Sequence, residues 1–121
     1  MRKRLTAKEE EIMQILWELK RAFVKEIIEQ LPDPKPHYNT ISTLIRRLEG
    51  LGFVDHERFG NTHRYFPLVE KEAYKERSIR HLLNHYFDNS YQDMVTFFAR
   101  EKKISPEELK RILKDIEDSQ P

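Results

Sequence analysis

The side chains best suited to chemistry in this 121-residue chain lie between Tyr38 and Leu51, where polar and apolar residues recur with helical spacing. Apolar residues three or four positions apart share one face of a helix, and here they are Ile41, Leu44, Ile45, Leu48 and Leu51. The opposite face and its flanks carry Asn39, Thr40, Ser42, Thr43, Arg46 and Arg47, and none of these six is acidic. Amide, hydroxyl and guanidinium groups hydrogen-bond base edges and phosphates. The pattern therefore predicts an amphipathic helix whose polar face binds nucleic acid, with Tyr38 at its start.

The segments before this helix have the order of a helix-turn-helix. Thr6 and Glu9 are spaced as a capping box, which predicts a helix start, and apolar residues follow at Ile12, Ile15, Leu16 and Leu19. A second, short helix is expected to carry Val24, Ile27, Ile28 and Leu31. Prolines within residues 32–36 stop it, because proline removes backbone donors and biases the preceding residue away from helix. Asn39 is expected to cap the third helix.

The residues after the third helix predict a β-hairpin. Segments 53–59 and 63–68 are rich in β-prone residues and flank the turn sequence Gly-Asn-Thr at 60–62, and Pro67 suits the end of an edge strand. Arg58 and Arg64 flank the tip, where they are placed for the phosphate backbone or the minor groove, although Arg64 has Glu57 as an alternative partner across the hairpin. A helix-turn-helix followed by a hairpin is a winged helix, so residues 1–69 are expected to form a DNA-binding domain.

From residue 70 onward the pattern is helical only, and Ser105 followed by Pro106 marks the start of a final helix. Three short amphipathic helices are marginal as an isolated fold, so we interpret residues 70–121 as a helical dimerisation domain. Its expected interface comprises Leu82, Leu83, Tyr86, Phe87, Val95, Phe98, Leu109, Ile112, Leu113 and Ile116. The predicted fold class is therefore mainly α with a small β-hairpin wing: a winged helix-turn-helix followed by a C-terminal helical dimerisation domain.

Composition excludes several classes of protein. The chain has no cysteine, which excludes disulfides, thiolate metal sites and thiol redox sensing. No apolar run approaches the roughly 20 residues of a membrane span, and no apolar signal core follows the first residues, so we expect a cytoplasmic protein without membrane insertion. No nucleophile–base pair or glycine-rich phosphate loop occurs, so neither an enzyme nor a cofactor is expected.

Charge and histidine placement leave two questions open. The net charge is only +1, which keeps alive the alternative of a winged-helix adaptor that binds proteins and not DNA, although Arg2, Lys3 and Arg4 form a basic tail. His81 and His85 have the spacing of a two-histidine metal site on one helix face, but no third ligand is evident and no metal is expected. Two further histidines, at positions 56 and 63, are expected to approach one another across the hairpin without a ligand role.

Taken in order and spacing, these residues resemble the penicillinase-repressor family of bacterial transcriptional regulators (the BlaI/MecI/CopY type). The resemblance covers nearly the whole chain and rests on four segments, residues 5–17, 38–48, 52–54 and 64–69. It implies a homodimeric repressor that binds a palindromic operator in double-stranded DNA. In the family, derepression commonly follows cleavage within the C-terminal domain, triggered by a membrane-bound sensor metalloprotease that detects β-lactam.

The chain departs from the family pattern in two ways. It lacks the cysteine-rich hook of the copper-responsive branch, so copper sensing by that route is excluded. The bond that aligns with the Asn-Phe cleavage site of the β-lactam branch is Phe97–Phe98, which makes this pair the candidate cleavage site without the family's Asn. The operator, the regulated genes and the inducing signal are left open by the sequence.

Overall fold

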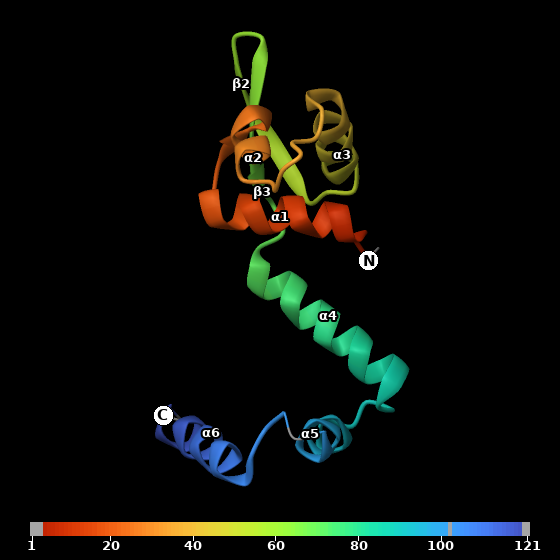
Figure 1. Ribbon diagram of the computed structural model, residues 1–121, viewed down its shortest axis with the longest axis vertical. Coiled ribbons are helices and arrows are strands. Elements are labelled where there is room, and N and C mark those ends of the chain that lie inside the picture. Colours follow the sequence, from red (N-terminus) through yellow and green to blue (C-terminus); the bar gives the residue numbers. More distant parts are fainter. Residues whose placement is uncertain (1–3, 102, 120–121) are drawn as a thin grey trace. The chain divides into compact units, whose positions relative to one another are not determined.

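The computed structural model describes residues 4–101 and 103–119, so Arg2 and Lys3 of the basic tail lie outside the described residues. The elements in chain order are α1 (Ala7–Leu19), β1 (Ala22–Phe23), α2 (Val24–Glu29), α3 (Tyr38–Gly50), β2 (Val54–Phe59), β3 (Thr62–Pro67), α4 (Lys71–Tyr86), α5 (Tyr91–Arg100) and α6 (Pro106–Ser119) (Figure 1). The chain divides into two compact units, an N-terminal unit within residues 1–76 and a C-terminal unit within residues 77–121. This division falls inside α4, whereas the sequence places a boundary after residue 69.

The helix α1 begins at the predicted capping box. The Thr6 hydroxyl accepts the backbone N–H of Glu9, and a Glu9 carboxylate oxygen accepts the backbone N–H of Thr6. These two reciprocal bonds satisfy N–H groups that the first turn of a helix leaves without partners. The apolar face of α1 then buries Ile12, Met13 and Leu16 completely in the core.

The start of α3 differs from the sequence prediction, because His37 and not Asn39 is its N-cap residue. His37 has an extended backbone, and its carbonyl accepts N–H groups from Thr40 and Ile41 at 3.1 and 3.3 Å. The helix therefore begins two residues earlier than an Asn39 cap would allow, and Asn39 lies in its first turn. His37 makes no side-chain capping bond, so the capping prediction for Asn39 was wrong.

The hairpin forms as predicted, but it belongs to a three-stranded antiparallel sheet in the order β1-β3-β2. The strands β2 and β3 join through a tight turn in which Gly60 has φ +59°, a conformation that favours glycine. On its other side β3 pairs with β1, at Tyr65 and Arg64. The strand β3 is therefore central, and the expectation that Pro67 ends an edge strand was wrong. Proline is tolerated there because β1 pairs only with Arg64 and Tyr65, before Pro67 is reached.

The core of the N-terminal unit lies between α1, α2, α3, the sheet and the first turns of α4. The ring of Tyr74, from α4, packs 5.8 Å from those of both Trp17 and Phe53. The Tyr74 hydroxyl donates to Glu10, and the indole N–H of Trp17 donates to the carbonyl of Val69, each at 2.9 Å. These contacts fix the start of α4 to the N-terminal unit, which explains why the division of the chain falls after it.

The C-terminal unit contains the rest of α4 together with α5 and α6. Ser90 caps α5 and Ser105 caps α6 through hydroxyls that accept backbone N–H groups at 3.0 and 3.1 Å, so the helix start predicted at Ser105 is confirmed. Among the described residues after Glu76, Leu83 alone is a buried hydrophobic. None of the helices in the described ranges is long and apolar enough to cross a bilayer.

Glu9 is the only charged side chain that is buried among the described residues, with 1% of its surface exposed. Its second carboxylate oxygen accepts the Nε–H of Arg47, which comes from α3. Burial raises the pKa of the Glu9 carboxyl, but hydrogen bonds from Thr6 and Arg47 and the positive charge of Arg47 outweigh it, so the pKa is lowered. An ionised carboxylate thus joins the start of α1 to α3.

We expect Glu9→Gln to lower the free energy of unfolding of the N-terminal unit by about 1–3 kcal/mol at pH 7, because an amide cannot balance the charge of Arg47. Since the folded state lowers the pKa of Glu9, this contribution is complete above the ordinary value of 4.5 and is lost as the pH falls through the folded-state pKa. Urea unfolding followed by the fluorescence of Trp17, the single tryptophan, measures the free energy of unfolding at neutral and at acidic pH.

The matched control is Glu11→Gln, on the same helix, because the ion pair that Glu11 makes within the described residues is with an exposed lysine, Lys8. It should change the free energy of unfolding by less than about 0.5 kcal/mol. The difference in free energy of unfolding between wild type and Glu9→Gln should become smaller when the pH is lowered from 7 to about 3. A difference of equal size at both pH values would show that the carboxylate charge of Glu9 does not act as described.

Candidate nucleic-acid interface

The helix α3 divides into a buried face and an exposed polar face. Its apolar residues Ile41, Ile45 and Leu48 are at most 2% exposed and belong to the core. The predicted binding residues lie on the other side: Ser42 is half-buried, and the exposed ones are Tyr38, Asn39, Thr40, Thr43, Arg46 and Arg47. Packing of one face therefore fixes which side chains α3 presents to solvent, and they are the ones that the sequence pattern singles out.

A hollow of about 280 Å³ separates this polar face from the hairpin, which we call the wing (residues 54–67). Figure 1 shows the tip of the wing extending past the helices of the N-terminal unit. The hollow brings together residues of both elements, and its lining comprises Val24, Tyr38, Asn39, Ser42, Arg46, Asn61, Thr62, His63 and Tyr65. Four of these belong to the wing and were not among the predicted site residues. The turn sequence at 60–62 located the tip, but nothing in it indicated which strand residues face α3.

The two wing arginines differ in how the fold uses them. Arg64 donates to the Glu57 carboxylate at 3.1 Å, and its guanidinium lies 4.7 Å from the centre of the Phe59 ring. The alternative pairing of Arg64 with Glu57 is therefore what the structure shows, and Arg21 adds a second bond to the same carboxylate at 2.9 Å. Hydrogen bonding from Arg64 lowers the pKa of Glu57, with further contributions from the Arg21 charge. Arg58 is exposed and makes a 3.4 Å contact with the carbonyl of Gly60 at the tip.

Arg46 and Arg47 are neighbours on α3 but have different surroundings. The Arg47 guanidinium binds the buried Glu9 carboxylate through Nε, while half of its side-chain surface stays exposed. Arg46 makes a 3.4 Å contact with Ser42 on its own helix and borders the hollow. Arg46 also lies near Tyr65, where its positive charge opposes the burial and the Glu49 charge that together raise the pKa of the Tyr65 hydroxyl. Arg47 thus anchors α3, and Arg46 faces the hollow.

Half of the ten predicted dimerisation residues are exposed in the single chain. Tyr86 is 73% and Leu113 is 59% exposed, whereas Leu83 is buried. The exposed large hydrophobics of this set are Tyr86, Val95, Ile112, Leu113 and Ile116, and the remaining members, Leu82, Phe87, Phe98 and Leu109, are partly buried. The Phe97–Phe98 bond lies inside α5, where the carbonyl of Phe97 accepts the N–H of Glu101 at 3.0 Å.

Three helices followed by a hairpin, with the polar face of the third helix beside that hairpin, define a winged helix-turn-helix domain. The solution structure of the DNA-binding domain of the repressor BlaI is similar, with a TM-score of 0.52 and 26% identity over 61% of this chain and 94% of that one. The fold class predicted from the sequence is therefore confirmed.

The sequence profile of the penicillinase repressor family matches residues 5–118, and the chain belongs to this family of transcriptional repressors. It is 28% identical over 109 residues to the methicillin resistance regulatory protein MecI of Staphylococcus aureus strain N315, a match that covers 89% of each chain. It is 26% identical over 113 residues to a penicillinase repressor of Bacillus licheniformis, covering 89% of this chain and 85% of the relative. The resemblance drawn from the residues is therefore confirmed.

The different surroundings of the two neighbouring arginines make a testable distinction. We expect Arg47→Ala to lower the free energy of unfolding of the N-terminal unit by about 1–3 kcal/mol, because it leaves the Glu9 carboxylate buried without its cationic partner. Arg46→Ala removes an exposed side chain and should change it by less than about 0.5 kcal/mol. Urea unfolding followed by Trp17 fluorescence measures both variants, and equal losses would contradict the distinction.

Proposed function

We propose that the protein is a homodimeric, sequence-specific repressor that binds a palindromic operator in double-stranded DNA through α3 and the wing. The observation that carries this proposal is the exposed polar face of α3 between Asn39 and Arg47, which bears amide, hydroxyl and guanidinium groups and no acid and borders the wing across a shared hollow. Membership of a repressor family and the fold shared with the BlaI DNA-binding domain support it.

The position of each side chain along α3 assigns it a role in this proposal. Asn39, Thr40 and Thr43 lie in the first turns, which is the part of a recognition helix that reaches base edges in the major groove. No side chain caps this helix at His37. The N-terminus of a helix favours negative charge, so this end of α3 is suited to an approaching phosphate. Arg46 either reads a guanine or holds a phosphate, and Arg58 contacts the DNA backbone from the wing.

Dimerisation through the C-terminal unit explains the apolar side chains that the single chain leaves exposed. The outward face of α6 carries Ile112, Leu113 and Ile116, with exposed fractions of 43%, 59% and 49%. Burying such a face against a second copy removes it from water, and a two-fold dimer matches a palindromic site. The recognition helices would then enter major grooves about 34 Å apart, or a multiple of that distance.

Relief of repression by proteolysis is the second half of the proposal. The Phe97–Phe98 bond lies in the C-terminal unit, and the exposed fraction of the Phe97 side chain is 48%. Cleavage there would separate α6 from the remainder of the chain. The agent we propose is a membrane-bound sensor protease of the kind found with the family, acting on a bond that lacks the family's Asn.

A net charge of only +1 leaves one rival function open, a winged-helix adaptor that binds a protein partner and not DNA. The two functions differ in their response to salt. Phosphate contacts release counterions, so affinity for DNA falls steeply as salt is raised. An anisotropy titration at two salt concentrations, on the inverted repeat nearest the promoter of this protein's gene and on a scrambled duplex, separates them.

For Arg46→Ala we expect operator binding to weaken by about 1–3 kcal/mol if Arg46 reads a base. If Arg46 holds a phosphate, the loss should be similar on operator and scrambled DNA, and the salt slope should fall by about one unit. Anisotropy with labelled duplexes gives both quantities. Arg111→Ala, which removes an exposed arginine of α6, is the matched control and should leave affinity unchanged. An unaltered affinity in Arg46→Ala would contradict both roles.

The proposed dimer makes a separate prediction. Leu113→Asp should raise the dimer dissociation constant at least about 100-fold, because a carboxylate at a buried apolar contact is poorly solvated. Analytical ultracentrifugation of the full chain measures it, and circular dichroism checks that the helices remain. Lys114→Asp places the same charge on the polar side of α6 and should leave the dimer intact. A wild-type chain that sediments as a monomer would refute the dimer itself.

A further inference from the structure

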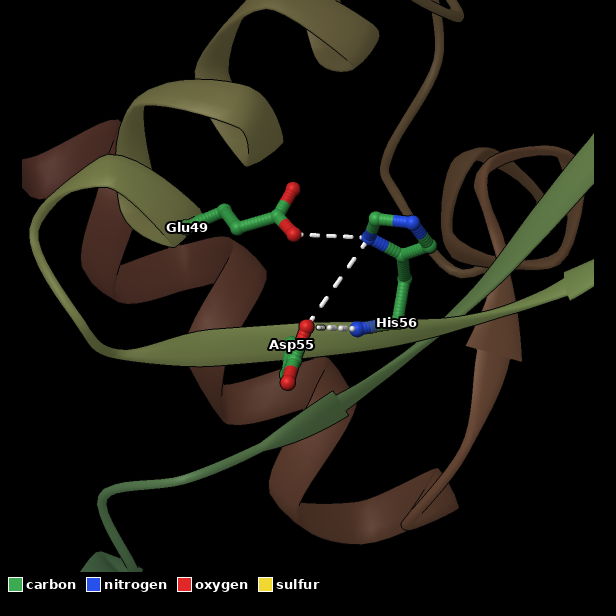
Figure 2. Close-up of side chains that lie close together, drawn as sticks. All are labelled: Glu49, Asp55 and His56. Carbon is green, nitrogen blue, oxygen red and sulfur yellow. Dashed lines mark hydrogen bonds and ion pairs between the residues drawn. The ribbon is translucent and has the colours of Figure 1, made fainter.

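Three potential metal ligands meet where α3 ends and β2 begins (Figure 2). Glu49 comes from the last turn of α3, and Asp55 and His56 are consecutive residues of β2. The Nδ1 atom of His56 lies 2.6 Å from a Glu49 oxygen and 3.9 Å from an Asp55 oxygen. One nitrogen and two carboxylate oxygens lie within 4.8 Å of one another, which is the one such group of three ligands found among the described residues.

The turn between α3 and β2 brings these side chains together. Gly52 has φ +85°, a left-handed conformation that glycine adopts without strain, and the chain reverses there from helix to strand. The backbone N–H of His56 donates to Asp55 Oδ1 at 2.8 Å and so orients that carboxylate. Figure 2 shows the imidazole Nδ1 directed toward oxygens of both acids.

Two neighbouring rings contact the imidazole of His56 and hold its orientation. The His63 ring stacks on the His56 ring with centroids 3.9 Å apart and planes 8° apart, so the predicted approach of the two histidines is confirmed. The Tyr65 ring lies 5.7 Å away. These two ring contacts restrict the rotation of the imidazole.

The charge of the cluster is unbalanced. In the described ranges, the ion pairs of Glu49 and Asp55 are those with the imidazole, and neither acid pairs with a lysine or arginine. The two carboxylates also lie near the C-terminal end of α3, where the helix dipole is negative. The Nδ1–H of His56 donates to the Glu49 carboxylate, and a bound metal ion would take the place of that proton and balance all three negative contributions.

We propose that Glu49, Asp55 and His56 bind a divalent transition-metal ion of the zinc type. Such ions take imidazole nitrogen and carboxylate oxygen at about 2.0–2.2 Å, so two ligand atoms on one ion lie roughly 3–3.5 Å apart. This separation falls between the 2.6 and 3.9 Å that separate His56 Nδ1 from the oxygens of the two acids. Mg²⁺ and Ca²⁺ prefer all-oxygen sites, and the imidazole selects against them. The ion would connect the last turn of α3 to the first residues of the wing. Neither the winged-helix fold nor membership of the family implies such a metal link.

Metal binding is measured on the full chain without an affinity tag and without DNA, so the result does not depend on the proposed function. Isothermal titration with Zn²⁺, and absorption spectroscopy with Co²⁺ as a probe, should show one ion per chain. His56→Gln and Glu49→Gln should each weaken Zn²⁺ binding at least about tenfold, while Mg²⁺ should not compete. Zn²⁺ should also raise the melting temperature of the wild type and not that of Glu49→Gln.

The matched control is the double variant His81→Gln and His85→Gln, which removes the other histidine pair, whose rings lie 3.9 Å apart on α4. It should bind Zn²⁺ as the wild type does. Trp17 fluorescence and circular dichroism establish that each variant is folded. The proposal is overturned if the wild type shows no saturable Zn²⁺ binding, or if binding survives in folded His56→Gln and Glu49→Gln. Loss of binding in the His81 and His85 variant alone would place the ion on α4 and overturn it equally.

Discussion

The position of α3 depends on one buried carboxylate. Glu9 closes the capping box of α1 with one oxygen and holds Arg47 of α3 with the other, so the start of the first helix and the polar helix are fixed by the same side chain. A buried charge is costly unless it is paired and hydrogen-bonded, and Glu9 has both kinds of partner. Burial of Ile41, Ile45 and Leu48 sets the rotation of α3 about its axis. With that rotation Arg47 reaches Glu9, and Arg46 faces the hollow beside the wing.

The two units use apolar residues differently. In the N-terminal unit Ile45, Leu48 and Phe53 are almost completely buried and leave little apolar surface on the polar face of α3. In the C-terminal unit the apolar residues of α6 stay exposed, although the spacing of both sets is equally helical. Periodicity therefore shows that a helix has an apolar face, but it does not show whether that face is buried by the same chain or by a second one.

Local patterns predicted much of this structure, and contacts between distant residues account for what they missed. The Thr6 capping box, the apolar stripe of α3 and the glycine turn of the wing each act within a few residues, so the sequence displays them directly. The strand β1 has only two residues and so shows no periodicity of its own. Its partner β3 lies about forty positions later in the chain, so no local pattern indicates the pairing. The pairing of Glu9 with Arg47, and the meeting of Glu49 with His56, likewise follow from packing that no local pattern records. Which wing residues line the hollow also depended on strand register.

The division of the chain within α4 determines what cleavage in α5 would do under the proposed function. Tyr74 lies with Trp17 and Phe53 in the N-terminal unit, whose span ends at Glu76, well before Phe97. A chain cut after Phe97 therefore keeps its complete DNA-reading surface and every contact that supports it. What it loses is tethering: a linked second domain binds its half-site at a high effective concentration, and this avidity amounts to factors of about 10²–10⁴. Derepression would then result from a loss of effective concentration. Each severed domain would still recognise its half-site, but it would dissociate more readily because no linked domain holds it near the DNA.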